Sequence, residues 1–276
     1  MSQIASFDPL AFSAFEYAGW QRVAEQYTAA FAGLTVQAAR ALLDAAHVQP
    51  GERVLDVACG QGDLAALAAQ RGAHAIGLDF SEAMLALARR RYPSIDFQQG
   101  NAQALPFLDG SFDAVVINFG LLHFSDPDQA LREARRVLRP GGWLGFTVWA
   151  PPEEALGFGI VLQALADYGN WQVPLPTAPH TFHLSDEREC TRTLLDLGFG
   201  DPLITRLPLL WELPSPAALF RAMSEGTVRT GGMLQAQTRE SLSGIYRSVV
   251  SALRQYENDG KVVVPMPAVL ASAPKS

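Results

Sequence analysis

The chain has few cysteines, few charged residues and no long apolar run. Its 276 residues include only two cysteines, Cys59 and Cys190, which is too few for the disulfide framework of a small secreted protein. No stretch approaches the roughly 18 consecutive apolar residues that span a bilayer. Charged residues make up 18% of the chain and hydrophobic residues 49%, a balance that excludes intrinsic disorder and long coiled coils.

Positive charge is also scarce. The chain carries 21 basic and 28 acidic residues, for a net charge of −7. Nucleic acids and anionic membrane surfaces are bound through basic patches, so this balance disfavours both as partners. The first charged residues, Asp8 and Glu16, are acidic, unlike the basic start of a signal peptide. We therefore expect a cytoplasmic protein, of an oligomeric state that the composition does not fix.

Short apolar runs alternate with amphipathic segments from residue 53 onward. The pattern predicts strands over 53–58, 73–79, 95–99, 112–118 and 143–149, with helices between them. Such alternation is typical of a parallel sheet covered by helices on both faces. Residues 8–47 have apolar and aromatic side chains at helical spacing, which predicts helices ahead of the first strand.

The pattern weakens after Trp149. Residues 150–184 contain five prolines and are expected to form an irregular cover over the sheet. Further along, a helix is expected near 186–197, a strand over 203–213 and a final strand over 262–264, with two helices between these strands. We expect three regions: N-terminal helices in 1–50 that cover a ligand site, a ligand-binding core in 51–150, and a cap with the last strands in 151–276.

A glycine turn follows the first predicted strand, in the run from Asp56 to Asp63 (DVACGQGD). Ligands bind at the carboxyl ends of the strands in such a sheet. The spacing of Gly60 and Gly62 fits a dinucleotide-binding turn, with Asp79 where an acidic residue would hold a ribose. The carboxylates of Asp56 and Asp63 would repel a pyrophosphate, however, and would suit a ligand with an ammonium and a sulfonium group. Asp63 could equally do no more than satisfy the helix N-terminus.

Several motifs follow one another in a fixed order between residues 53 and 149. They are the acidic-x-Ala-x-Gly-x-Gly turn at 56–62, GLDFSEAML around Asp79, GNAQALPF at 100–107, Phe112-Asp113, and LRPGG at 138–142. With these motifs the segment resembles the S-adenosylmethionine-binding core of class I methyltransferases, in the small-molecule branch. Similar segments occur in the quinone-biosynthesis methyltransferases.

The resemblance implies a fold, a cofactor and a set of contacts. The fold would be a Rossmann-like, mainly parallel α/β sheet of seven strands, the last one reversed, with a helical cap. The cofactor would be S-adenosyl-L-methionine. Its binding residues would be Asp56 and Ala58 in the acidic-x-Gly positions, Gly60 and Gly62 along the methionine half, Asp79 on the ribose hydroxyls, Phe80 on the adenine face, Asn101 and Ala102 at the adenine edge, and Asn118 and Phe119 on the far side through backbone groups.

The chain departs from the family pattern at three places. Ala58 replaces the first glycine of the turn, which is tolerated if its backbone φ is negative. Asn101 replaces an aspartate, and its amide oxygen can still accept a hydrogen bond from the adenine amino group. The quinone enzymes follow the fourth strand with Gly-Leu-Arg-Asn, whereas this chain has Gly120-Leu-Leu-His123. This last difference argues against a quinone substrate.

Methyl transfer needs a general base only where the acceptor must lose a proton. His123, at the active end of the sheet, could take a phenolic or alcoholic proton, or could be a structural residue at a helix entrance. His180 and His183 lack further metal ligands nearby in the sequence, so no metal site is expected.

The expected activity is therefore methyl transfer to a small, largely apolar metabolite. Oxygen is the acceptor atom that we expect, with carbon or nitrogen as the other choices. Two alternatives stay open. The chain could bind the same cofactor without transferring methyl, as a scaffold or a rearrangement catalyst. A nicotinamide-dependent oxidoreductase is disfavoured by the carboxylates that flank the glycine turn and by the absence of an evident Tyr-x-x-x-Lys pair.

Overall fold

Seven strands form one sheet in the computed structural model, which describes residues 7–179 and 182–276. Their order across the sheet is β3-β2-β1-β4-β5-β10-β6. All neighbours from β3 to β5 pair in parallel, whereas β10 runs antiparallel to both β5 and β6. The predicted mainly parallel sheet with a reversed last strand is confirmed. The strands are β1 (Arg53–Val57), β2 (His74–Asp79), β3 (Asp96–Gln99), β4 (Phe112–Asn118), β5 (Leu138–Trp149), β6 (Leu203–Leu207) and β10 (Ala268–Pro274).

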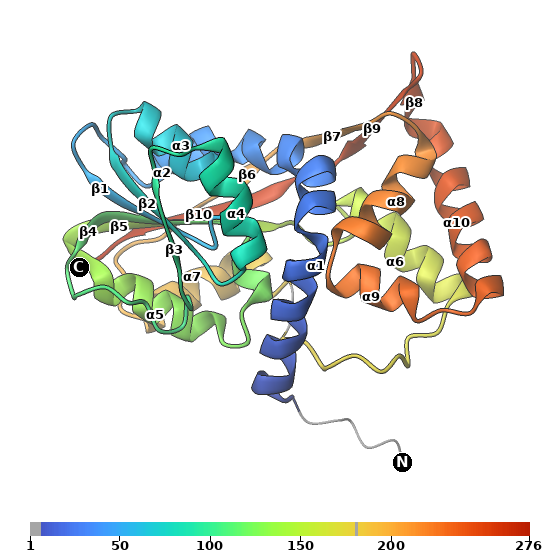
Figure 1. The fold of residues 1–276 in the computed structure, drawn as a ribbon, viewed down its shortest axis with the longest axis horizontal. Coiled ribbons are helices and arrows are strands. Elements are labelled where there is room, and N and C mark those ends of the chain that lie inside the picture. The colour runs from blue at the N-terminus through green and yellow to red at the C-terminus, as the bar shows by residue number, and fades with distance from the viewer. Residues whose placement is uncertain (1–6, 180–181) are drawn as a thin grey trace.

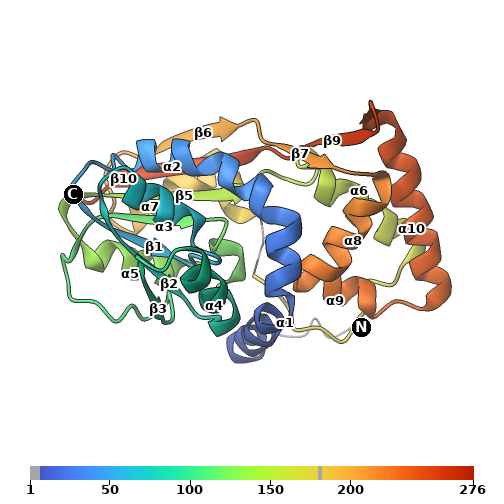
Figure 2. The ribbon, with the colours of Figure 1, turned by 45° about the horizontal axis from the view of Figure 1, so that its top comes forward.

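Helices cover both faces of this sheet, as the alternation predicts (Figure 2). Successive side chains of a strand point to opposite faces. In β1, Val54 accordingly packs with α2 (Ala39–Ala45) and α3 (Asp63–Gln70), whereas Leu55 packs with α5 (Pro127–Val137) and α7 (Glu187–Asp196). The helix α4 (Glu82–Arg91) packs with α3 and β3. The helix α7 thus belongs to the sheet even though it lies in the C-terminal half of the chain.

The remaining elements form a cap beside the sheet (Figure 1). It consists of α6 (Leu156–Tyr168), α8 (Pro216–Gly226), α9 (Arg229–Gln235) and α10 (Arg239–Leu253), with a small sheet of β7 (Leu210–Leu213), β9 (Lys261–Pro265) and β8 (Glu257–Asn258). Four short 3₁₀ segments complete the described chain: η1 (Val36–Ala38), η2 (Leu121–His123), η3 (His183–Ser185) and η4 (Arg254–Tyr256). The small sheet and the helices share one apolar cluster, which includes Trp211, Met223 and Val249.

Four predictions for this half of the chain are wrong. Three helices, α8, α9 and α10, rather than two, lie between the strands expected over 203–213 and 262–264. Residues 150–184 are not wholly irregular, because α6 lies within them. The strand expected over 203–213 is two strands in different sheets, since Pro208, with its fixed φ and no N–H, interrupts the ladder between them. The strand near 262–264 belongs to the small sheet, and β10 is the last strand of the main one.

A single long helix, α1 (Pro9–Thr35), lies between the main sheet and the cap (Figure 1). Its first turn is capped by Asp8, whose carboxylate accepts hydrogen bonds from the N–H groups of Leu10 and Ala11. Along its length it buries Phe12 and Trp20, and near its end Phe31 packs into the cap cluster. No helix in the described ranges is both long enough and apolar enough to cross a membrane.

Candidate active site

The glycine turn after β1 is held in left-handed backbone conformations. Gly60 has a φ of 54° and Gly62 a φ of 86°. A side chain at Gly62 would also clash, because an added Cβ would lie 2.6 Å from Cζ of Phe97. Ala58 has a φ of 56° as well, so the condition for replacing glycine without strain, a negative φ, is not met. An L-residue in this conformation costs about 1–2 kcal/mol, which the turn sustains without glycine.

Asp79 ties the glycine turn to the end of β2. Its Oδ2 accepts a hydrogen bond from the N–H of Gly60 at 2.9 Å, and its Oδ1 accepts one from the N–H of Ser81 at 2.8 Å. Burial raises the pKa of this carboxyl to about 6, against the opposing effect of the two N–H donors. The carboxylate is therefore both a clamp on the turn and an acceptor at the strand end where ligands bind.

Asp56 is a buried carboxylate with hydrogen bonding shown for one of its two oxygens. Its Oδ2 accepts a hydrogen bond from the N–H of Ala65 at 3.0 Å, whereas its Oδ1 has no hydrogen-bond partner in the part of the chain that the structure describes. Burial, with Asp79 and Asp63 nearby, raises the pKa of this group well above its ordinary value. An unpaired buried acceptor costs free energy, so this oxygen suits a ligand that brings a donor.

Asp63 does not cap the helix that it begins. The cap residue of α3 is Gly62, with no side-chain hydrogen bond. The carboxylate of Asp63 instead accepts from Tyr92 and pairs with Arg91, with 2.9 Å between Oδ1 and Nη2. The reading of Asp63 as a helix cap is therefore wrong.

A small cavity of about 50 Å³ lies between the glycine turn and α1. Its polar lining residues are two carboxylates, Asp56 and Asp63, two amides, Gln61 and Asn118, and two hydroxyl-bearing residues of α1, Tyr27 and Thr35. Burial raises the pKa of the Tyr27 hydroxyl, which keeps this phenol neutral. The lining thus favours a positively charged group.

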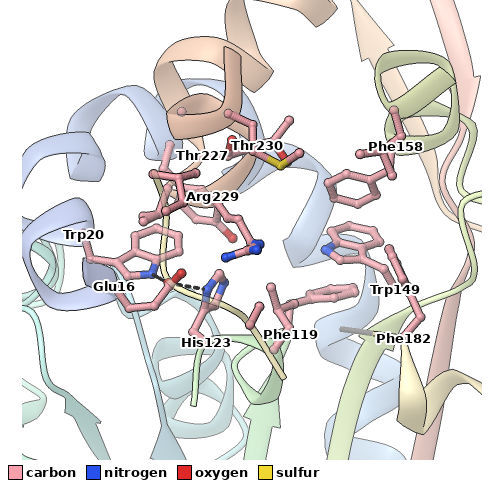
Figure 3. Close-up of a pocket in the computed structure, with 18 of the residues that line it drawn as sticks. Glu16, Trp20, Phe119, His123, Trp149, Phe158, Phe182, Thr227, Arg229 and Thr230 are labelled. Carbon is pink, nitrogen blue, oxygen red and sulfur yellow. Dashed lines mark hydrogen bonds and ion pairs between the residues drawn. The ribbon is translucent and has the colours of Figure 1, made fainter. Parts of the chain in front are cut away.

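A much larger cavity, of about 490 Å³, lies beyond the ends of β4 and β5 and beneath the cap (Figure 3). Phe119 and Trp149, which follow and end these two strands, stack with 3.9 Å between their ring centroids. Its other aromatic walls are Trp20, Tyr27 and Phe31 from α1, Phe158 from α6, and Trp171 and Phe182. The space suits a flat apolar ring system.

His123 faces this cavity and is held by a carboxylate from another part of the chain. Its Nδ1 lies 2.9 Å from Oε2 of Glu16, and the indole N–H of Trp20 donates to the same oxygen at 3.1 Å (Figure 3). Glu16 is almost fully buried. A carboxylate that receives Nδ1–H leaves Nε2 as the free, basic nitrogen of the ring.

The neighbours Asn118 and Phe119 serve different cavities. Asn118 lines the small one, and its side chain is fixed by the carbonyl of Thr35 and the hydroxyl of Thr147. The N–H of Phe119 is bonded to Thr147, so the ring of Phe119, rather than this backbone group, faces the ligand space. The N–H of Phe119 is thus engaged within the protein, and the expected contact of the cofactor with backbone groups of Asn118 and Phe119 stays a prediction.

The residues expected around an adenine lie at the ends of β2 and β3. Phe80 is half-buried and meets Tyr17 of α1 edge to face, with 5.9 Å between centroids. Asn101 is exposed, and its Oδ1 already accepts a hydrogen bond from the N–H of Gln103 at 2.9 Å. Ala102 is buried in the core cluster. Phe80 and Asn101 thus follow the paired strands β2 and β3, whereas Ala102 is part of the core.

Comparison with known proteins identifies the family to which the chain belongs. Residues 55–146 match the family model described as "Methyltransferase domain". A demethylmenaquinone methyltransferase of Renibacterium salmoninarum is 47% identical over 203 residues, which cover 70% of this chain and 84% of that protein. The chain belongs to the class I S-adenosylmethionine-dependent methyltransferases. Its core is of the quinone-biosynthesis type, although other relatives with the same name are matched over only about half of their length.

Solved structures of this methyltransferase fold agree. The YcgJ protein of Bacillus subtilis aligns with a TM-score of 0.58 and 19% identity, over 87% of this chain and 98% of that one. A geranyl diphosphate C-methyltransferase of Streptomyces coelicolor, solved with S-adenosyl-L-homocysteine, aligns with a TM-score of 0.51 and 18% identity, over 87% and 79%. The methyltransferase uses S-adenosylmethionine, and the nicotinamide alternative is discarded.

The residues at the glycine turn fit S-adenosylmethionine. The unpartnered Oδ1 of Asp56 and the oxygen-rich lining suit its ammonium and sulfonium charges, and Asp79 can accept from ribose hydroxyls. Ligand pockets usually span about 300–1,000 Å³, far more than the small cavity offers. Tyr27 and Thr35 of α1 also line that cavity, so a cofactor that extends from it would contact α1 as well as the glycine turn.

Two polar residues of the large cavity, Glu16 and Arg229, belong to no motif that the sequence analysis identified. For Glu16, the one available clue is a carboxylate among the aromatic residues of a predicted helix. Arg229, on α9, is remote from every motif. Of the two histidines considered for a metal, His180 lies outside the described residues. Among those described, no cluster of three or more His, Cys, Asp or Glu side chains could hold a metal ion.

Proposed function

We propose that this methyltransferase adds a methyl group to a ring carbon of a hydroquinone-like aromatic acceptor. The observation that carries the proposal is the aromatic cavity of about 490 Å³, into which a histidine held by a buried carboxylate projects (Figure 3). Flat walls such as the Phe119–Trp149 stack suit a fused or substituted ring. The histidine supplies the base that a phenolic acceptor needs.

The reaction divides between the two cavities. S-adenosylmethionine supplies a methyl carbon that its sulfonium activates for displacement. His123 Nε2 takes the proton of a ring hydroxyl, and Glu16 supports the imidazolium that forms. The ring carbon next to the ionised oxygen then supplies the electron pair of the new C–C bond, while the S–CH₃ bonding pair returns to sulfur. Loss of that carbon's own hydrogen as a proton to solvent, with return of the proton from His123 to the ring oxygen, restores the aromatic hydroquinone.

The relatives support carbon as the acceptor atom. The Renibacterium protein bears the name of demethylmenaquinone, a quinone that lacks a ring methyl group. Leu122 and His123 stand where the quinone enzymes have Arg and Asn, a difference that argues against a quinone substrate. Both residues line the cavity, so the difference alters the side chains that would contact the acceptor ring. Paired with Glu16, however, His123 provides the proton acceptor that a quinol requires. Oxygen, the acceptor atom expected from the sequence, is tested by the same experiment.

The test is an assay with S-adenosylmethionine carrying a ¹³C-labelled methyl group. A short-chain demethylmenaquinol, kept reduced, serves as the acceptor, and a simple naphthol is run beside it. The expected product has its label on a ring carbon, which resonates far upfield of an O-methyl carbon in the NMR spectrum. Label on oxygen would overturn the acceptor atom. No product from either acceptor, by a protein that binds the cofactor, would overturn the substrate class.

A further inference from the structure

Arg229 is a cation inside the acceptor cavity. It begins α9 in the cap and lines the cavity, and its side chain points toward the middle of the space (Figure 3). The residue is half-buried, and burial lowers the pKa of its guanidinium from the ordinary value. A charge in this setting is costly unless hydrogen-bond acceptors surround it.

The protein satisfies Arg229 only in part. Its Nη1 donates to the carbonyl oxygen of Pro176 at 2.8 Å, whereas a guanidinium has five N–H donors. Within residues 7–179 and 182–276, no carboxylate forms an ion pair with it. Among the residues that the structure describes, several donors of the group therefore have no acceptor.

The one carboxylate that lines this cavity is engaged elsewhere. Glu16 attracts Arg229 at a distance, but its Oε2 is shared by Trp20 and His123. The other polar lining residues are neutral: the phenol of Tyr27 and the hydroxyls of Thr177, Thr227 and Thr230. A ligand that carries an anion would therefore give Arg229 an ion-pair partner that the lining residues do not supply.

We propose that Arg229 binds an oxyanion on the methyl acceptor, and so restricts the substrate class to acidic aromatic rings. The oxyanion is either the ring oxygen that His123 deprotonates or a carboxylate substituent of the ring. A carboxylate offers two coplanar oxygens that match the guanidinium fork, and a phenolate offers one charged oxygen that can accept a charge-assisted hydrogen bond from it. This inference deepens the proposed function, and it rests on the same cavity as the acceptor site.

The experiment compares pairs of anionic and neutral ring ligands by calorimetry, with S-adenosylhomocysteine present. One pair is 2-naphthoate and 2-naphthamide. The other is 4-nitro-1-naphthol, held above its pKa, and its methyl ether. A charge-assisted hydrogen bond should give the anionic member an advantage of about tenfold or more in the wild type. The pair that shows the preference identifies the source of the oxyanion.

Three variants sharpen the result. Arg229→Gln should remove the preference, and Arg229→Lys should keep part of it. Arg221→Gln, which removes an exposed arginine from α8 in the same cap, should leave the preference unchanged. Unaltered melting temperatures and S-adenosylhomocysteine affinities show that the fold survives.

Two results would overturn the inference: a wild type that binds neutral and anionic members equally, or an Arg229→Gln protein that still prefers the anion. The wild-type comparison decides the matter even where the glutamine variant does not fold. Because these are binding measurements, they are independent of turnover. A protein that methylates no quinol can still show the preference, and one that methylates a quinol can lack it.

Discussion

The strand edge that we propose for the cofactor and the cavity that we propose for the methyl acceptor are built in different ways. At the edge, the polar groups come from a short stretch of the chain. The backbone N–H groups of Gly60, Ala65 and Ser81 donate hydrogen bonds to the carboxylates of Asp56 and Asp79. The cavity instead gathers side chains from Glu16 to Met233, on elements of every region of the chain. The edge depends on local backbone geometry, whereas the cavity depends on how distant elements pack.

The largest effect is expected where the cavity performs chemistry. His123→Gln keeps a hydrogen-bonding group beside Glu16 but cannot take a proton, so kcat should fall about 10²–10⁴-fold. Cofactor affinity, measured by calorimetry, should stay unchanged because the glycine turn is untouched. Glu16→Gln should lower kcat less, since it removes only the support of the imidazolium. An unaltered kcat in His123→Gln would show that the histidine is structural.

The matching change at the cofactor edge is Asp79→Ala. It removes the acceptor for Gly60, Ser81 and a ribose, so S-adenosylhomocysteine should bind about 100-fold more weakly. The acceptor cavity should bind 2-naphthoate or its amide as before, because Asp79 does not line it. An equal loss of affinity for S-adenosylhomocysteine and for the naphthoate ligands would mean that the two sites do not bind independently. The affinity of Asp79→Asn for S-adenosylhomocysteine should lie between those of the wild type and Asp79→Ala, because asparagine keeps one acceptor oxygen.

The edge should also respond to pH in a way that the cavity does not share. Hydrogen bonds from ribose hydroxyls need Asp79 ionised, and the pKa of this group is raised to about 6. Cofactor affinity should therefore fall about tenfold per pH unit below about pH 6.

Folding stability responds to the same group with the opposite sign. Between about pH 4 and pH 6 the folded chain holds a proton on Asp79 that the unfolded chain has lost. The contribution of this group to stability is therefore full below about pH 4 and is lost as the pH rises through about 6. Calorimetric titrations and urea melts across this range measure both trends. In Asp79→Asn neither trend should appear, and a persistent trend would assign the titration to another group.

The smallest effect concerns the strained alanine of the turn. Ala58→Gly relieves a left-handed φ, partly offset by the greater freedom of glycine in the unfolded chain, so stability should rise by about 0.5–1 kcal/mol. Urea denaturation measures it, and Ala69→Gly within α3 is the matched control that should lower stability. A less stable Ala58→Gly protein would show that contacts of the methyl group outweigh the strain.

The sequence predicted the part of the molecule whose signals are contiguous. The alternation of strands and helices, the positions of Gly60 and Gly62, and the placement of Asp79 after β2 all follow from short-range patterns. The φ of Ala58 did not, because the neighbouring hydrogen bond from Gly60 to Asp79 fixes a conformation that alanine does not choose by itself. Residues 150–184 were misread because prolines at both ends conceal the apolar face of α6.

By itself, the sequence determined the fold class, the cofactor edge and the methyltransferase family, since a strand, a turn and a helix N-terminus are encoded by neighbouring residues. Only the tertiary structure decided the acceptor cavity. Glu16 and His123 are 107 residues apart and meet at 2.9 Å because α1 crosses the end of the sheet. Arg229 enters the same space because α9 packs in the cap above it. Packing between distant elements is cooperative, so no local pattern records which side chains it brings together.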